Sequence, residues 1–298
     1  MLHYRQEIRM KRFLALLRVH QWVKNAFIIF PLVFSSRLFE GDKFEAVLMT
    51  LFAFCCLASG VYIFNDLLDF RHDRLHPKKK HRPLSAGSIT PTQAWCLAIP
   101  LLAIGVACSF WVNEGVGSVA LFYMAIHLVY NLWAKKIVIL DVFFIAFGFQ
   151  LRIWAGSLAV GVLPSEWLQM CVFVLSLFLG FTKRRSELKD LKEKASEHRH
   201  SLLDYNFYLL DQIIMITAAL TIMFYGLYSI SPELMARLGN ARMVYSLGFV
   251  IFGIFRYLYL VHVRNLGGEP GDLLLKDAPL CIDVLLWLLF IAVAIYHF

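Results

Sequence analysis

The chain has 298 residues, of which 59% are hydrophobic and only 17% are charged, and its mean hydropathy is +0.64. A soluble domain carries about 25% charged residues, so this composition excludes an ordinary water-soluble fold and predicts an integral membrane protein. The formal net charge is +8, but the basic residues are confined to short segments between apolar runs. That pattern is typical of membrane topology signals and argues against nucleic-acid binding.

In chain order, residues 1–19 are basic with interleaved apolar positions, which predicts an interfacial amphipathic helix. Nine apolar runs follow, each close to the roughly 20 residues that a spanning helix needs. The third run begins with a capping box, Thr90-Pro91-Thr92-Gln93. We therefore expect one all-α, polytopic membrane helical bundle over residues 1–298. The nine runs are 22–39, 44–64, 92–111, 116–134, 138–160, 165–182, 207–229, 242–263 and 281–298.

The Lys and Arg residues predict the orientation of this bundle. If the N-terminus is cytoplasmic, twenty-four of them fall on the cytoplasmic side and only Arg37, Lys43, Arg237 and Arg242 fall outside, with Arg152 inside a run. The positive-inside rule then places the C-terminus outside the cell. It also makes the two long charged loops, 65–91 and 183–206, cytoplasmic.

The first of these loops begins with a cluster of oxygen-bearing side chains. At about 100° per residue, Asn65, Asp66, Asp69 and Asp73 fall at roughly 0°, 100°, 40° and 80°, so a helix would carry all four on one face. Such ligands suit Mg²⁺, which usually also binds phosphate oxygens. The basic run Lys78–Arg82 follows at once. The pattern predicts a metal-dependent phosphoryl or diphosphate site; the plainer alternative is a solvated helix end.

Three further features each allow two interpretations. Lys183, Arg184 and Glu187 open the second loop, where they either bind substrate, with Lys183 and Glu187 facing the cavity together, or only fix topology. Lys24 lies where the first run meets the cytoplasmic interface and could contact a lipid phosphate or serve as an anchor. Arg152, inside the fifth run, is either functional or part of an ion pair that holds the bundle. We assign His127, Asn131, Asp204 and Asp211 to the bundle or its interface rather than to ligand binding.

Several motifs together resemble the UbiA superfamily of intramembrane prenyltransferases. They are NDLLDFRHD from Asn65, QWVKN from Gln21, DRLHPKKKHRPLSAG from Asp73, DVFFIAFGFQLRIWAG from Asp141, FTKRRSEL from Phe181 and FRYLYLVHVRNLGGEPGDLLLKDAPL from Phe255. Except for the first, they resemble the decaprenyl-phosphate phosphoribosyltransferase branch. Many superfamily members carry a second Asp-rich motif after the sixth span, whereas this chain has Lys183-Arg184-x-x-Glu187. Fewer acids and more bases suit a donor with an additional phosphate.

The resemblance implies a Mg²⁺-dependent enzyme of the bacterial inner membrane that moves 5-phosphoribose from phosphoribosyl diphosphate to a polyprenyl phosphate. It implies that Asp66, Asp69 and Asp73 are catalytic and, with Asn65, bind the metal. The oligomeric state stays open, with a homo-oligomer among the options. The residues expected at the substrates are Lys24, Asn65, Arg74, Lys78, Lys80, Arg82, Lys135, Lys183, Arg184, Glu187 and Tyr205.

Two other functions compete with this interpretation. A prenyltransferase that uses an aromatic or quinone precursor would share the first motif but predicts a second acidic cluster. A transporter or channel would place ionisable residues at mid-membrane on several spans, where only Arg152 fits.

Overall fold

The computed structural model describes residues 12–75, 79–192, 205–238, 242–264, 266–268, 271, 273 and 276–296. These residues form helices, and no strand occurs among them. Eight helices are long and apolar enough to cross a membrane, which confirms an all-α multi-pass bundle. The expected helix over residues 1–19 lies largely outside the described residues. The helices are η1 (Val19–Ile28), α2 (Phe30–Phe34), α3 (Gly41–Asp73), η2 (Lys79–His81), α4 (Pro91–Val112), α5 (Glu114–Leu132), η3 (Ala134–Lys136), α6 (Leu140–Val160), α7 (Glu166–Lys192), α9 (Phe207–Ser229), α10 (Pro232–Leu238), η4 (Arg242–Ser246), α11 (Leu247–His262) and α13 (Ala278–Tyr296).

The first apolar run differs from the prediction because it is not one continuous helix. It folds as the 3₁₀ helix η1 followed by the five-residue helix α2, with Pro31 in the first turn of α2. A proline has no N–H to bond the preceding turn, so a continuous helix is interrupted there. The other eight runs each coincide with one of the long helices. The predicted capping box is present, with the Thr90 hydroxyl accepting from the Gln93 N–H at 3.3 Å.

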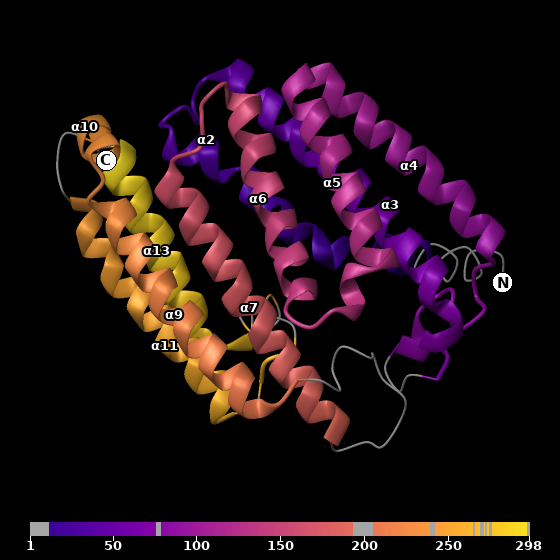
Figure 1. The fold of residues 1–298 in the computed structure, drawn as a ribbon. Coiled ribbons are helices and arrows are strands. Elements are labelled where there is room, and N and C mark those ends of the chain that lie inside the picture. Colours follow the sequence, from indigo (N-terminus) through magenta and orange to yellow (C-terminus); the bar gives the residue numbers. More distant parts are fainter. Residues whose placement is uncertain are drawn as a thin grey trace.

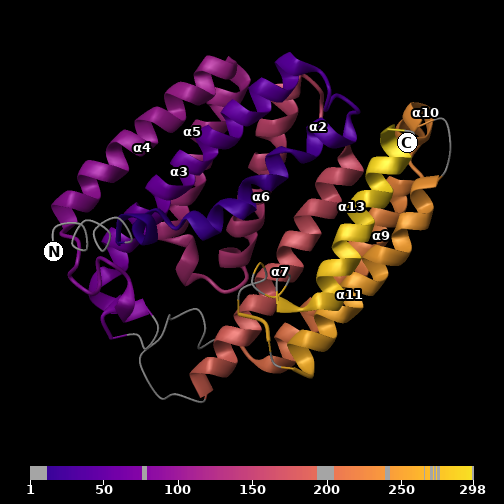
Figure 2. The ribbon, with the colours of Figure 1, turned by 180° about the vertical axis from the view of Figure 1, so that it is seen from behind.

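The helices lie in a sequence-ordered arrangement. Helices α3, α4 and α5 lie on one side, α9, α11 and α13 lie on the other, and α6 and α7 lie between them (Figure 1). Seen from behind, η1 runs across the bundle against α3 and α6 (Figure 2). Gly156 of α6 permits this packing, because a Cβ there would lie 2.1 Å from the Ile28 carbonyl oxygen. A side chain at this position would push η1 away from the bundle.

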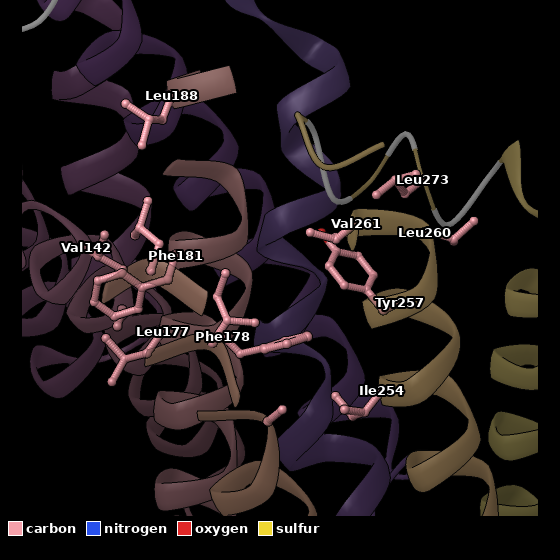
Figure 3. Close-up of a cluster of buried hydrophobic side chains, with 14 of the residues drawn as sticks. Val142, Leu177, Phe178, Phe181, Leu188, Ile254, Tyr257, Leu260, Val261 and Leu273 are labelled. Atoms are coloured by element: carbon pink, nitrogen blue, oxygen red, sulfur yellow. The ribbon is translucent and has the colours of Figure 1, made fainter. Parts of the chain in front are cut away.

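Apolar packing joins the two sides of the molecule. Phe178 and Phe181 of α7 are buried between Val142 of α6 and the α11 residues Ile254 and Tyr257 (Figure 3). Burying a large side chain of this kind contributes about 1.5–3 kcal/mol, so this cluster fixes α7 against both neighbours. The charged end of α7 is thereby held in a defined position.

Two helices extend beyond the apolar runs that predicted them. Helix α3 continues to Asp73 and α7 continues to Lys192, so the predicted loops 65–91 and 183–206 begin inside helices. The carboxyl ends of α3 and α7 and the turn between α5 and α6 lie at the same end of the bundle (Figure 1). The charged residues of these three segments therefore share one end of the molecule.

Candidate active site

One arginine, Arg82, contacts two carboxylates of the acidic face of α3. Asp66 and Asp73 are 2% and 6% exposed, and both accept hydrogen bonds from the same Arg82 Nη1 atom, at 3.1 and 2.6 Å. Arg82 follows η2 in the segment that folds back from the end of α3. Because one nitrogen contacts both carboxylates, Asp66 and Asp73 point to the same place, as their helical spacing predicts.

Two more cations come from distant parts of the chain. Arg18, next to η1, forms an ion pair with Asp66 and lies over the Tyr62 ring, 5.0 Å from its centroid. Lys135 of η3 contacts both carboxylate oxygens of Asp69, at 2.7 and 2.8 Å. Each of the three carboxylates therefore pairs with a base. In the sequence Arg18 is one of the basic residues that indicate topology, and nothing in the local pattern links it to Asp66, which lies 48 residues away.

The geometry fits a magnesium ion that is bound partly by carboxylates and partly by phosphate oxygens of a substrate. Among the described residues, no three His, Cys, Asp or Glu side chains gather into a preformed metal cage. Mg²⁺ usually takes one or two carboxylates together with phosphate oxygens and water, so such a cage is not required. Asp66 and Asp73 face a common point and supply such a pair. Asp69 instead turns towards Lys135, so the predicted four-residue ligand set is not assembled in this structure.

A second, buried network lies at the start of α6. Asp141 is fully buried and accepts from Arg184 Nε at 2.7 Å and from the Tyr205 hydroxyl at 3.1 Å. Arg184 also pairs with Glu187. A buried guanidinium needs such partners, because an unpaired buried charge is strongly destabilising. Arg184 and Glu187, which the sequence places at a substrate, pair with each other here, and their contact with a substrate stays a prediction. The local pattern around Asp141 gives no signal for its pairing with Arg184.

Tyr205 has a different environment from the one expected of a substrate-binding residue. Its hydroxyl donates to Asp141 and accepts from the backbone N–H of Ile139 at 2.6 Å. Ile139 has a φ of 70°, which is unusual for a β-branched residue, so this hydrogen bond holds a strained turn between η3 and α6. Burial and the adjacent Asp141 carboxylate raise the pKa of Tyr205. The hydroxyl is therefore neutral and already hydrogen-bonded on both sides, and its contact with a substrate stays a prediction.

The remaining predicted residues occupy varied positions. Lys183 is half-buried on α7 beside Arg184, and Asn65 and Lys24 are half-buried as well. Arg74 is exposed and lies over the Phe70 ring at 5.5 Å, and Lys80 is exposed. Lys78 and Asp204 lie outside the described residues.

An all-helical membrane bundle with paired carboxylates and clustered cations at one end is the architecture of an intramembrane enzyme for phosphorylated substrates. The chain belongs to the UbiA prenyltransferase family, whose family model matches residues 28–270. A UbiA homologue from Archaeoglobus fulgidus has been solved with GPP and Mg²⁺.

Individual relatives and solved structures agree with this assignment. The chain is 30% identical to decaprenyl-phosphate phosphoribosyltransferase of Mycolicibacterium smegmatis, covering 94% of this chain and 91% of that protein. It is also 30% identical to the enzyme of the same name from Corynebacterium glutamicum, covering 94% and 85%. The Archaeoglobus fulgidus structure has a TM-score of 0.72 at 19% identity, covering 96% of this chain and 99% of that one, and shows a shared fold.

Proposed function

We propose that this protein transfers 5-phosphoribose from phosphoribosyl diphosphate to a polyprenyl phosphate and releases diphosphate. The similarity to the two named phosphoribosyltransferases supports this substrate pair. The structural observation that carries the proposal is the set of bases around the acidic face of α3. Arg18, Arg82 and Lys135 contact its carboxylates. Lys183 belongs to α7, whose carboxyl end lies at the same end of the bundle (Figure 1). Such a set suits a donor that carries three phosphoryl groups.

In the proposed reaction, an oxygen of the acceptor phosphate forms a bond to C1 of the ribose. The bond between C1 and the diphosphate oxygen breaks, and its electron pair leaves with the diphosphate. The acceptor oxygen is already anionic, so the chain needs no general base. Bound Mg²⁺ would neutralise the diphosphate, and Asp66 and Asp73, with Asn65 and Asp69 beside them, would hold it.

The basic residues would change partners when the donor binds. Arg18, Arg82 and Lys135 now pair with the carboxylates. With those carboxylates directed at a metal, the same cations would bind phosphate oxygens and stabilise the charge that develops on the leaving group. In this proposal, Arg184 and Glu187 act as positioning residues that hold Lys183.

We further propose that the protein lies in a bacterial inner membrane with its N-terminus and active site on the cytoplasmic side and its C-terminus outside. The distribution of Lys and Arg supports this orientation. A cytoplasmic site would also suit a water-soluble donor, while the lipid acceptor approaches through the membrane.

The identity of the transferred group tests the proposal. Membranes containing the protein should move label from ribose-labelled phosphoribosyl diphosphate to farnesyl phosphate or a longer polyprenyl phosphate. Transfer of a prenyl group from a prenyl diphosphate to 4-hydroxybenzoate, without ribose incorporation, would favour the aromatic prenyltransferase instead. Membranes without the protein supply the background for both reactions.

A further inference from the structure

A buried arginine lies deeper in the bundle than the acidic face. Arg152 of α6 is 5% exposed and lies twelve residues beyond Leu140, or about 18 Å along the helix from its charged end. It donates to the Asn25 side-chain oxygen at 2.8 Å, the Gly148 carbonyl at 2.7 Å and the Tyr123 hydroxyl at 3.0 Å. Its partners in the described part of the chain are all neutral, so the alternative of an ion pair that holds the bundle does not fit.

Next to this arginine lies a second buried polar group, and this one has no hydrogen-bond partner among the described residues. The Nε2 atom of His127 is buried and has no hydrogen-bond partner among the described residues. A Cβ placed on Gly148 would lie 3.3 Å from this atom and 3.5 Å from Arg152 Nη1, so both groups converge on the bare backbone of Gly148. Buried polar groups are normally hydrogen-bonded, and an orphan one indicates a missing partner.

A third basic residue approaches from η1. Lys24 is half-buried and lies within electrostatic range of His127, on which Arg152 also acts. Arg152 and His127 thus meet at Gly148, with Lys24 within electrostatic range of His127, and the described interactions of Arg152 and His127 include no carboxylate. The Arg152 guanidinium is a buried charge whose described partners are all neutral, and a buried charge needs a counterion, so this arrangement favours a bound anion.

The position of Lys24, His127 and Arg152 relative to the acidic face of α3 indicates which anion would bind there. Arg18, which pairs with Asp66, lies over Tyr62; Tyr62 in turn lies within electrostatic range of Tyr123, which bonds Arg152. The donor's diphosphate would bind at the acidic face on the water side. An anion that binds on the membrane side of the acidic face is expected to be the head group of a lipid, because its apolar chain can lie in the membrane.

We propose that Lys24, His127 and Arg152 bind the phosphate of the lipid acceptor and present its oxygen to the donor from the membrane side. This inference rests on the proposed function and adds the acceptor's binding residues to it. The ligand class is a phosphate monoester on an isoprenoid chain.

Direct binding tests this site without turnover. Farnesyl phosphate, with farnesol and inorganic phosphate as comparisons, is titrated into the purified protein in detergent, and binding is followed by calorimetry. Lys24→Ala should weaken farnesyl phosphate binding about ten- to a hundredfold, the value of a lost charge-assisted contact. It should leave Mg²⁺-dependent binding of phosphoribosyl diphosphate unchanged. Lys136→Ala, an exposed lysine on η3, is the matched control and should change neither.

Gly148→Ala provides a second variant that removes no charge. Its methyl group would crowd the space between His127 and Arg152 and should weaken farnesyl phosphate binding, whereas Gly226→Ala, with only ordinary contacts at 3.8 Å or more, should not. Farnesyl phosphate binding that survives both Lys24→Ala and Gly148→Ala, or binding no tighter than that of farnesol, would overturn the inference. Lys24-dependent binding without ribose transfer would instead support the anion site and overturn the proposed donor.

Discussion

The buried network around Asp141 predicts a large and specific loss of stability. Asp141→Ala would remove the carboxylate that bonds Arg184 Nε at 2.7 Å and the Tyr205 hydroxyl at 3.1 Å. Arg184 is 2% exposed, and of its ion pairs among the described residues the one to Glu187, whose side chain is 32% exposed, would remain. Breaking a buried pair by removing one partner costs about 3–5 kcal/mol. We expect the free energy of unfolding, measured by SDS titration in mixed micelles, to fall by about that amount.

Two comparisons separate this cost from a general effect of losing a charge. Asp42→Ala breaks an exposed pair with Lys43, at 3.2 Å with the Asp42 side chain 73% exposed, and should leave the free energy of unfolding almost unchanged, because solvent screens such a pair. The double variant Asp141→Leu/Arg184→Met removes both buried charges and should recover most of the loss. An Asp141→Ala protein of wild-type stability but with a raised KM for the donor would refute this reasoning, because Arg184 would then bind substrate.

The other predictions concern the donor and the metal. Lys183→Ala should raise the KM for phosphoribosyl diphosphate about ten- to a hundredfold, because the lost contact is charge-assisted, and should leave the acceptor's KM unchanged. Lys136→Ala is the control. An unchanged donor KM in Lys183→Ala would mean that Lys183 only fixes the membrane topology. Chelation by EDTA should abolish transfer, and Asp73→Asn should raise the Mg²⁺ concentration needed for half-maximal rate while the protein still inserts and folds. Asp42→Asn is the control. If Asp73→Asn keeps the Mg²⁺ dependence of the wild type, the Asp73 carboxylate does not bind the metal and only belongs to a solvated helix end.

Local patterns in the sequence were sufficient for the helices and for one face of the site. The apolar runs predicted nine spans, of which eight are long helices in the described part of the chain, and the spacing of Asp66 and Asp73 predicted that they point to the same side. Both follow from periodicity within one segment, which a sequence displays directly. The break at Pro31 was also visible in the sequence, but the run around it is long and apolar enough to suggest one span.

Contacts between distant segments could not be predicted in the same way. Arg18 and Asp66 are 48 residues apart, and Lys135 and Asp69 are 66 residues apart. The sequence predicted Arg184 either at the substrate or as a topology signal, because its partner Asp141 lies 43 residues earlier at the start of another helix. A base that binds a substrate and a base that neutralises a buried carboxylate have the same sequence signature, and only the packing of α6 against α7 separates them.

The pairing at the acidic face has a consequence for the order in which the proposed ligands bind. Mg²⁺ alone would draw the carboxylates of Asp66 and Asp73 away from Arg82. The half-buried Arg82 guanidinium would then lose both of these partners. The donor alone would bring phosphates against carboxylates that are still negative. Only the two together give every carboxylate a metal and every base a phosphate, so all the charges exchange partners without any being left unpaired. The structure therefore favours joint binding of metal and donor over binding of either one first.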